Sequence, residues 1–492
     1  MSQTSPSKFP FFSLEPRMRI LHLSWIAFFV TFVVWFNQAP LMASIRDTFG
    51  LTKPQVAALL TLNVALTIPA RILVGVLVDK IGPRLMYSLL LAISGVICLF
   101  FAFAQDFASL ALARFLLAFV GAGFVVGIRI IGEWFPARET GLAQGLYAGL
   151  GNFGSAVGAI LLPTVAAMYA GPEGWRWAIA GTGILAIVYS GIYYAFVTDT
   201  PKGSTYFSPK KLGAMEVTSK GDFVLYCIMQ LPLVLTLGLL AYKLGPSALG
   251  LLSETTTTLI YIGLAALLAF QLYDAWRINK GIFTTPVAAI HQYKFRQVAV
   301  LDFVYFITFG SELAVVSILP LLFKDMFGLS LPVAGFLGAS FGLTTFFARP
   351  IGGYLSDRFG RQNILLVCLA GTALGYFLMS RMSPDSGVAF AVAATFFCSL
   401  FVNAGNGAVY AMLPMIKRRL TGQIAGMVGA FGNVGGVLFL TVYSGYDAQT
   451  LFLVAAIGSA LAAALVWLFI EDPKGQITEE MPDGTIAMID VT

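Results

Sequence analysis

The stretch PARILVGVLVDKIGPR at residues 69–84 returns later in the chain as FARPIGGYLSDRFGRQ at residues 347–362. At an offset of 278 residues, the Ala, Arg, Gly, Leu, Asp and Gly positions of the two copies coincide. Further along, Gly-Asn-Phe-Gly at 151–154 matches Gly-Asn-Val-Gly at 432–435 at an offset of 281 residues. Two separate matches at nearly one offset indicate duplicated halves. Parallel repeats of this kind build transporters that rock around a site near the bilayer midplane.

The composition places these repeats in a membrane. Of 492 residues, 58% are hydrophobic and 11% are charged, and the mean hydropathy is +0.84. Because a water-soluble protein of this length could not bury so much apolar side chain, lipid is the expected solvent. The net charge of +6 is scattered along the chain and does not favour nucleic acid binding. The four cysteines lie in apolar runs without metal-site spacing, so neither a metal nor a cofactor is expected.

Apolar runs that are long enough to cross a bilayer, about 20 residues each, form two series. The first series lies near 20–45, 54–78, 84–104, 107–131, 139–169 and 175–197. The second lies near 297–323, 332–352, 362–381, 386–414, 420–445 and 449–470. The sequence therefore predicts an all-α polytopic membrane protein with two six-helix repeats.

Residues 198–296 separate the two series and contain two further apolar runs, at 223–243 and about 255–273. Basic residues flank both runs: Lys202, Lys210, Lys211 and Lys220 before the first, and Arg277, Lys280, Lys294 and Arg296 after the second. Because Lys and Arg concentrate in cytoplasmic loops, both flanks are expected inside, and an even number of crossings must join them. Two extra helices with an outer loop around 244–254 give fourteen spans. Two runs lying flat on the membrane would leave twelve.

The same rule orients the whole chain. Short loops on one side carry Lys80, Arg84, Arg138, Arg358, Arg361, Lys417, Arg418 and Arg419, and those on the other carry Arg46, Lys53, Arg176, Lys324 and Arg381. The richer side is expected to be cytoplasmic, which places both termini inside a cell membrane, either plasma or inner. We expect a cytoplasmic tail (1–19), an N-terminal six-helix bundle (20–197), a central linker (198–296), a C-terminal six-helix bundle (297–470) and a second cytoplasmic tail (471–492).

Each copy of the repeat contains glycines and charges at fixed spacing. They are Gly75, Asp79, Gly82 and Arg84 in the first copy, and Gly353, Asp357, Gly360 and Arg361 in the second. This pattern resembles the loop motif of the major facilitator superfamily, which follows the second helix of each half. The first copy departs from it slightly, because Pro83 precedes the basic residue. We expect the glycines to permit close helix approach and the Asp and Arg side chains to form an ionic latch that governs gating.

Two arginines are expected deep in the membrane, Arg71 and Arg349, at equivalent positions of the repeat. Each lies eight residues before the loop Asp, about 12 Å deeper at 1.5 Å rise per residue. An ionisable residue at this depth is a functional hypothesis by default. In the structural interpretation, each arginine pairs with a carboxylate or extends its side chain to the membrane interface. In the functional interpretation, both arginines face a central cavity and clamp one anion. The planar, forked guanidinium suits an oxyanion. Arg114 and Arg129 lie near helix ends, where helix-end roles are expected.

Glu312, within TFGSELAVV, is the acid expected at mid-depth, because Asp302 lies near the cytoplasmic end of the same helix. It is a candidate proton carrier. The alternative is that Glu312 is a permanent partner of a nearby arginine.

The fifth run of each series, at 139–169 and 420–445, is rich in glycine, which usually indicates tight helix packing in lipid. Asn152 and Asn433 interrupt the two glycine faces at matched positions. Here AGLGNFGSAVG (148–158) and GAFGNVGGV (429–437) resemble the Gly-Asn-x-Gly signature of the nitrate/nitrite porter family of the major facilitators. That family also has paired arginines in the second and eighth helices and a seventh-helix tyrosine that contacts substrate, matched by Tyr305. The resemblance implies that Arg71, Arg349, Tyr305, Asn152 and Asn433 bind nitrate or nitrite.

Secondary active transport of nitrate or nitrite is the expected function, with protons as the coupling ion and the lipid bilayer as the environment. Moving a monovalent anion inward against an inside-negative potential costs about 2.3 kcal/mol per 100 mV, so import requires two or more cotransported protons or exchange for an outgoing anion. Proton symport is favoured because Glu312 is available, and nitrate/nitrite exchange is the alternative. A transporter of another small anion and a non-transporting nutrient sensor also remain open. An enzyme is disfavoured, since no nucleophile–base set or metal-ligand cluster is evident.

Overall fold

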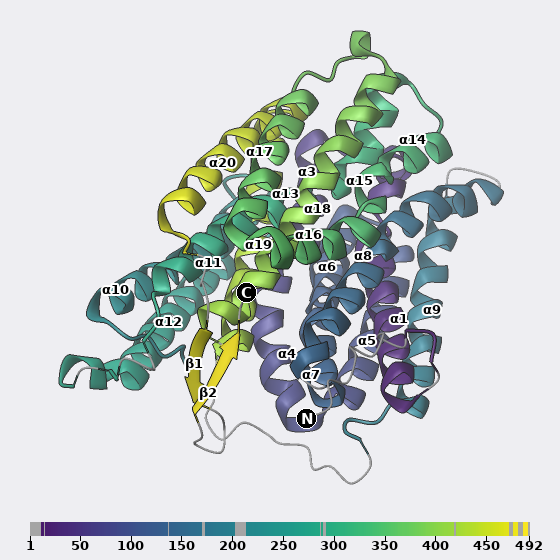
Figure 1. The fold of residues 1–492 in the computed structure, drawn as a ribbon. Helices are drawn as coiled ribbons and strands as arrows, with labels where there is room; N and C mark the ends of the chain where they lie inside the picture. The colour runs from purple at the N-terminus through teal and green to yellow at the C-terminus, as the bar shows by residue number, and fades with distance from the viewer. Residues whose placement is uncertain are drawn as a thin grey trace.

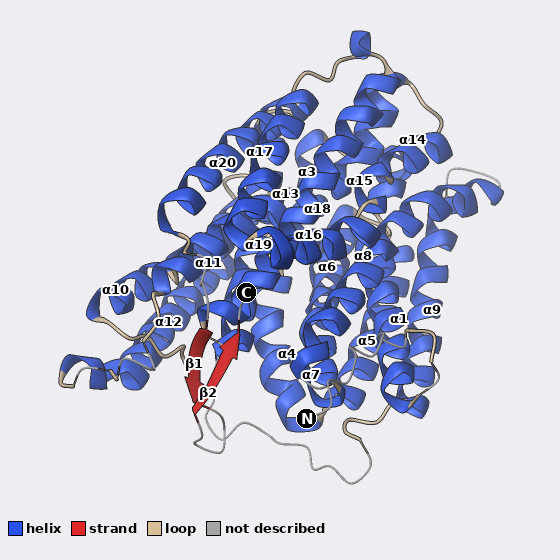
Figure 2. Cartoon of the chain, viewed as in Figure 1, coloured by secondary structure: helices blue, strands red, loops and turns tan. Residues whose placement is uncertain are grey.

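A computed structural model of the chain describes residues 11–13, 15–135, 137–169, 173–201, 213–285, 287–288, 292–417, 420–471, 476–480 and 486–490. Helices dominate this part of the chain (Figures 1 and 2). Fourteen helical segments within it are long and apolar enough to cross a membrane, so the prediction of fourteen spans is confirmed. Some positions used to orient the chain, including Lys202, Lys210 and Arg418, lie outside the described residues.

The N-terminal bundle consists of the helices before the central segment. Its elements are α1 (Pro16–Phe36), η1 (Ala39–Leu41), α2 (Met42–Phe49), α3 (Lys53–Ala65), α4 (Thr67–Ile81), α5 (Pro83–Ala102), α6 (Phe107–Leu117), η2 (Ala118–Ala122), α7 (Gly123–Trp134), α8 (Ala137–Met168) and α9 (Gly174–Phe196). Local signals set the helix starts: Asp106 accepts a hydrogen bond from the Ser109 backbone amide in a capping box at the start of α6, which satisfies a free helix donor.

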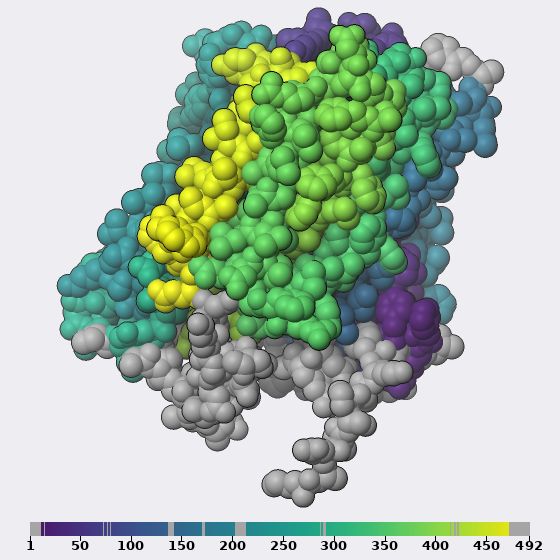
Figure 3. All heavy atoms as spheres, turned by 45° about the horizontal axis from the view of Figure 1, so that its top comes forward, coloured from purple at the N-terminus to yellow at the C-terminus, as the bar shows by residue number. Residues whose placement is uncertain are grey.

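The C-terminal bundle repeats this plan. Its elements are α13 (Phe295–Phe327), α14 (Leu331–Gly338), α15 (Ser340–Leu343), α16 (Thr345–Phe359), α17 (Arg361–Met379), η5 (Pro384–Ser386), α18 (Val388–Ile416), α19 (Thr421–Gly445) and α20 (Ala448–Phe469). The second span of each bundle is broken in the same way, by Leu66 before α4 and by Thr344 before α16. Figure 3 shows α20, in yellow, on the outer surface against the green helices of this bundle.

The central segment forms α10 (Lys220–Ile228), α11 (Leu231–Leu244), α12 (Glu254–Asn279) and η3 (Lys280–Phe283). α11 and α12 pack together as a hairpin on one flank of the molecule, where α11 also contacts α3 and α19 (Figure 1). Only 6% of the apolar window of α12 is buried, and large apolar side chains such as Leu259, Phe270 and Trp276 lie exposed on it. An apolar surface of this extent calls for lipid rather than water.

The C-terminal tail contains structure that the sequence reading did not predict. Strands β1 (Gln476–Glu480) and β2 (Ile486–Asp490) form an antiparallel two-stranded sheet, with Gln476 opposite Asp490. This hairpin and the start of α1 lie toward the same end of the bundle (Figure 1).

Glycines allow the closest helix contacts in each bundle. A Cβ atom added at Gly154 of α8 would lie 2.3 Å from the carbonyl oxygen of Phe29 in α1. A Cβ atom at the matched Gly435 of α19 would lie 2.1 Å from the carbonyl oxygen of Phe306 in α13. Both distances are far inside van der Waals contact, so only glycine permits these backbones to approach. The glycine-rich helices therefore have the packing role that their composition suggested, and they hold Asn152 and Asn433 on closely packed helices within the two bundles.

Candidate anion-binding site

The two deep arginines meet around one aromatic ring. Arg71 of α4 and Arg349 of α16 are each 8% exposed. Their guanidinium carbons lie 5.9 Å and 5.5 Å from the centroid of Phe309, which α13 places between the bundles. The broken second span of each bundle thus directs equivalent side chains to the same ring. This is the arrangement expected of a clamp built from two duplicated halves.

Arg71 lacks a countercharge in this structure. Its Nη1 donates to the Gly429 carbonyl oxygen of α19 at 2.8 Å, and its guanidinium carbon lies 5.6 Å from the Phe124 ring centroid. Its Nε has no hydrogen-bond partner, and no carboxylate of the described residues pairs with it. A buried cation with an unused donor is costly unless an anion completes its surroundings.

Arg349 is surrounded by acceptors. Its Nη2 donates to Glu312 Oε2 at 2.6 Å, and its Nε donates to Asn403 Oδ1 at 3.1 Å. With its amide turned so that the oxygen faces Arg349, Asn152 accepts from Nη2 at 3.2 Å and also from Nη1. Asn406 Nδ2 donates to the same Glu312 oxygen at 2.7 Å. Arg349 is therefore already held as one member of a buried ion pair, so the alternative role of Glu312 as an arginine partner describes this state.

Each arginine contacts the Gly-Asn-x-Gly helix of the opposite bundle. Arg349 reaches Asn152 on α8, and Arg71 reaches Gly429 on α19. Asn433 Nδ2 donates to the same Gly429 oxygen at 2.9 Å, while Asn433 Oδ1 has no partner. The structure thus brings Asn152 directly to an arginine and links Asn433 to the other through a shared carbonyl.

Aromatic rings wall the space beside the arginines. Tyr305, 3% exposed, stacks on Phe309 with centroids 4.9 Å apart and packs edge-on against Tyr410 at 5.3 Å. A Cβ atom at Gly432 would lie 2.7 Å from Phe309 and 2.8 Å from Tyr305. The absence of a side chain at Gly432 therefore lets α19 accept the rings, and flat aromatic faces suit a planar ion.

Charge counting shows what the centre can hold. Among the described residues it contains two guanidinium groups, Arg71 and Arg349, and the Glu312 carboxylate. With Glu312 ionised, the buried net charge is about +1, which one monovalent anion would neutralise. A divalent anion would overcompensate unless Glu312 took up a proton.

The repeated loop motif lies at a distance from this centre. Gly82 and Gly360 have φ values of +83° and +93°, a region that favours glycine. Arg361 Nη2 pairs with Asp357 Oδ1 at 2.9 Å, across the turn from α16 to α17. In the first copy, the Arg84 backbone amide instead donates to Asp199 Oδ1 at 2.7 Å. Gly75 faces Val125 and Gly353 faces Gly407, while the Asp79 side chain lies outside the described part.

Sequence reasoning missed several residues of the centre. Phe309, Asn403 and Asn406 contact the arginines or Glu312, and the amides of FVNAGNG (401–407) in an apolar helix were the available signal. Arg114 lies in the last turn of α6, near a helix end as expected, but it is fully buried. Arg114 is 0% exposed and donates to Asn63 Oδ1 at 2.9 Å and Asn37 Oδ1 at 3.1 Å. It is a third buried arginine, held by neutral oxygens.

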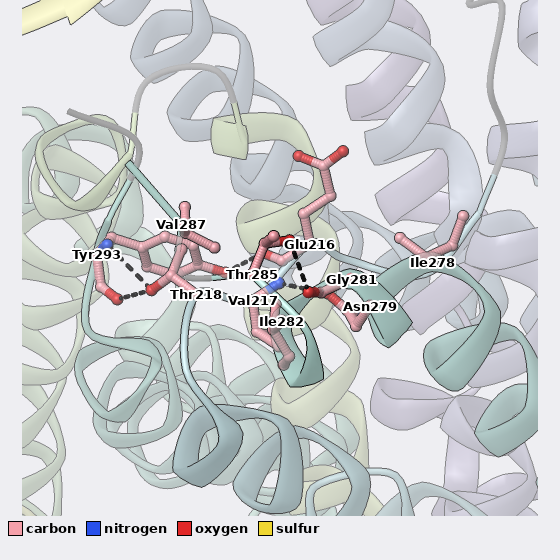
Figure 4. A pocket seen from close by; sticks show the side chains of 10 residues that line it. All are labelled: Glu216, Val217, Thr218, Ile278, Asn279, Gly281, Ile282, Thr285, Val287 and Tyr293. Carbon is pink, nitrogen blue, oxygen red and sulfur yellow. Dashed lines mark hydrogen bonds between the residues drawn. The ribbon is translucent and has the colours of Figure 1, made fainter. Parts of the chain in front are cut away.

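A separate cavity of about 280 Å³ lies against the central segment. Figure 4 shows Glu216, Asn279 and Tyr293 among its lining residues. Asn279 Oδ1 accepts from the Val217 amide at 2.8 Å, and Thr218 Oγ1 donates to the Tyr293 carbonyl at 2.7 Å. These bonds hold the chain before α10 against the end of α12 and against the residues directly before α13. Among the described residues the lining offers a carboxylate and no basic side chain, which does not suit an anion.

Comparisons with known proteins extend this picture. A family model described as Major Facilitator Superfamily matches residues 24–291 and 301–487. The chain is 42% identical to the nitrate/nitrite transporter NrtP of Picosynechococcus sp. over 95% of both chains. It is 43% identical to the nitrate/nitrite transporter NrtP of Nostoc punctiforme over 94% of both. A solved D-xylose-proton symporter shares the fold, with a TM-score of 0.63 at 14% identity over 92% of this chain and 98% of that one.

Fold and family match define the class, a multi-pass membrane protein of the kind that transports solutes rather than catalysing reactions. The chain belongs to the major facilitator superfamily and, within it, to the nitrate/nitrite porter family.

Proposed function

We propose that this chain transports nitrate and nitrite across a cell membrane by alternating access, with the anion bound between Arg71 and Arg349. One observation supports this proposal above the others: Arg71 is buried against the same ring as Arg349, where the two bundles meet, and no countercharge among the described residues pairs with it. The relatives named as nitrate/nitrite transporters match nearly the whole chain. A monovalent, planar oxyanion satisfies the charge, the unused donor and the aromatic walls together.

The remaining predicted site residues have defined parts in this proposal. Arg71 Nε, which has no partner, faces the ion, and Arg349 contributes a second fork. Tyr305 bounds the site through its stack on Phe309. Asn152 orients Arg349, and Asn433 turns its amide nitrogen toward the ion when Arg71 leaves Gly429. The loop motifs, including Gly75, Asp79, Gly353 and their neighbours, act in gating and do not contact the substrate.

Import coupled to protons is the direction and mechanism that we favour. Arg349 Nη2 is bound to Glu312 at 2.6 Å, so the arginine becomes fully available to an anion only when that carboxylate is protonated. Proton binding to Glu312 and anion binding to Arg349 then promote each other, which is the linkage that symport requires. The alternative is nitrate/nitrite exchange. In that mechanism Glu312 stays paired with Arg349, and the site changes the side to which it opens only with an anion bound.

Orientation and domain limits belong to the same proposal. The start of α1 and the β1–β2 hairpin that follows α20 lie toward one end of the bundle (Figure 1), and the excess of Lys and Arg in the loops supports a cytoplasmic location for that end. The working domains are bundles at 20–197 and 297–470, the linker at 198–296, and tails at 1–19 and 471–492. The membrane is the plasma or inner membrane of the cell.

Labelled nitrate uptake into proteoliposomes tests the proposal. With an inward proton gradient and no internal nitrite, symport gives accumulation that a protonophore abolishes. Uptake that appears only in nitrite-loaded vesicles identifies an exchanger. The absence of nitrate uptake in both conditions refutes nitrate as the substrate. The remaining hypotheses are then a transporter of another small anion and a nutrient sensor.

Lysine variants test the clamp. Arg71→Lys and Arg349→Lys keep the charge but lose the fork, so each should lower transport by at least about tenfold, because a charge-assisted hydrogen bond contributes about 1.5–3 kcal/mol. Arg176→Lys is a matched control, since Arg176 is buried in α9 and binds the Ala102 and Ala104 carbonyls at 2.8 and 2.7 Å. Near-normal transport in either clamp variant would refute the clamp.

A further inference from the structure

A second carboxyl group lies buried in α13, outside the site described above. Asp302 is 0% exposed, and neither of its carboxylate oxygens has a hydrogen-bond partner in the described part of the chain. From the sequence it was expected near the cytoplasmic end of its helix, where water would solvate it. The structure instead encloses it, seven residues into α13.

No countercharge faces Asp302 from the helices packed on α13. The titratable side chains of the helices that pack most extensively on α13, and of α13 itself, are Tyr443 on α19, Cys398 and Tyr410 on α18, Lys220, Asp222, Tyr226 and Cys227 on α10, Arg46 and Asp47 on α2, Lys53 on α3, and Arg296, Tyr305, Glu312, Lys324 and Asp325 on α13. Three further groups reach α13 at other residues: Arg349 at Glu312, Arg71 at Phe309 and Tyr376 at Ser311. None of them bonds to the Asp302 carboxylate. α20, α14 and α15 carry no titratable side chain.

Several of these groups have other partners. Arg296 is paired with Glu471 at 2.8 Å. The Tyr226 hydroxyl accepts from the Met215 amide at 3.2 Å. Arg46 pairs with Asp325 at the far end of α13. Asp302 therefore has no hydrogen-bond or ionic partner among the described residues and is closed off from solvent.

Burial of an isolated ionised carboxylate costs several kcal/mol or more, and such a group takes up a proton instead. Asp302 is thus neutral in this state. A neutral carboxyl still has one donor and two acceptor oxygens to satisfy, so its present surroundings are unfavourable for either form. A state in which water or a polar group reaches Asp302 would relieve this cost and allow the proton to leave.

The position of Asp302 connects it to the moving parts of the site. Phe309 lies seven residues further along α13, two helical turns, so both side chains project from nearly the same face about 10 Å apart. This face packs on α19, where a Cβ atom at Gly432 would collide with Phe309. Asp302 therefore lies on the α19-facing side of α13, in line with the ring that both arginines contact. Glu312 lies ten residues beyond Asp302, about 15 Å along the helix.

We propose that Asp302 is a second proton-binding site of the transport cycle, which holds a proton in the closed state described here and releases it in a state in which water or a polar group reaches the carboxyl. This inference rests on the proposed transport function. It adds a titrating carboxyl to Glu312, on the same helix and on the side of the arginine centre where α13 begins.

Transport by the full chain in proteoliposomes tests the proposal through Asp302→Asn, which mimics the protonated form. Nitrate/nitrite counterflow, which needs no proton movement, should stay within about twofold of the wild type. Proton-driven accumulation at a gradient of one pH unit should fall by about tenfold, because one pH unit acting on one proton corresponds to a tenfold ratio. The pH profile of uptake should flatten. Asp302→Glu, which retains a carboxyl, should restore the pH dependence with a shifted midpoint.

Asp385→Asn is the control variant, since it removes an exposed loop carboxyl and should behave as wild type. An Asp302→Asn protein with unchanged accumulation and pH profile would overturn the proposal. An infrared measurement separates this result from a failure of the proposed function. A protonated-carboxyl stretch that is present in wild type, lost in Asp302→Asn and variable with pH supports the site even if no nitrate moves. A missing or pH-invariant band overturns it.

Discussion

Replacing Glu312 by Gln would test two effects of the buried Glu312–Arg349 ion pair. One is its contribution to stability, and the other is its competition with nitrate for Arg349. In the structure, Glu312 Oε2 accepts from Arg349 Nη2 at 2.6 Å and from Asn406 Nδ2 at 2.7 Å. The glutamine is nearly isosteric and can still accept from Asn406. It cannot neutralise Arg349, so the net charge of the centre rises from about +1 to about +2.

The size of the effect follows from burial. Glu312 and Arg349 are 5% and 8% exposed, and removing one member of a buried ion pair typically costs about 3–5 kcal/mol. Without anion, the variant should lose about that much stability. Nitrate then faces a guanidinium that no longer has a competing carboxylate. One recovered charge-assisted hydrogen bond contributes about 1.5–3 kcal/mol, so nitrate should bind about 10- to 100-fold more tightly.

Thermal unfolding of the purified protein, titrated with nitrate, measures both quantities at once. The variant should unfold at a lower temperature than wild type without nitrate and recover more of its stability as nitrate is added. Transport should fail in the proton-driven assay, because tight binding without a releasable proton stops the cycle. Glu133→Gln is the control, since it removes the carboxylate paired with Arg129 in α7. An equal or weaker nitrate response in Glu312→Gln than in wild type would refute the reasoning.

Three further perturbations follow from single contacts. Gly432→Ala places a Cβ atom 2.7 Å from Phe309. Because overpacking costs about 1–3 kcal/mol and displaces the rings, nitrate uptake should fall by about tenfold. Unaltered uptake would contradict the tight contact. Arg46→Glu should disrupt the 2.6 Å pair with Asp325 that joins the bundles, and adding Asp325→Arg should restore at least half of the lost transport; no restoration would show that the pair is incidental. Arg114→Met should lower the unfolding temperature, because its buried acceptors lose their donors at about 1–3 kcal/mol each, and an unchanged unfolding temperature would exclude that role.

Much of the fold was readable from the sequence because lipid imposes simple rules. A span needs about 20 apolar residues, so the helices appeared as runs, and the repeat offset paired them. The central hairpin of α11 and α12 followed from the basic residues on its flanks. The β1–β2 hairpin was missed, since two five-residue strands in a polar tail give no comparable pattern.

The centre was readable only in part. Arg71 and Arg349 stood out because a charge in an apolar run has few explanations. Phe309 did not, because one phenylalanine among 42 carries no signal until a structure places both arginines beside it. Burial of Asp302 and Arg114 was also hidden. Position along a helix predicts depth, but neighbouring helices decide whether water reaches a side chain.

The two bundles place Arg71 and Arg349 symmetrically, but the carboxylate of the centre is present on one side alone among the described residues. Each arginine reaches across to the Gly-Asn-x-Gly helix of the opposite bundle, so separating the bundles on either side must disturb both contacts. Only Arg349 has a carboxylate partner among the described residues, however. An anion entering the centre therefore meets one arginine that is free to bind it and another that must first leave Glu312. In the proposed cycle the duplicated frame lets the two bundles rock, and protonation of this single unmatched carboxylate frees Arg349 for the anion.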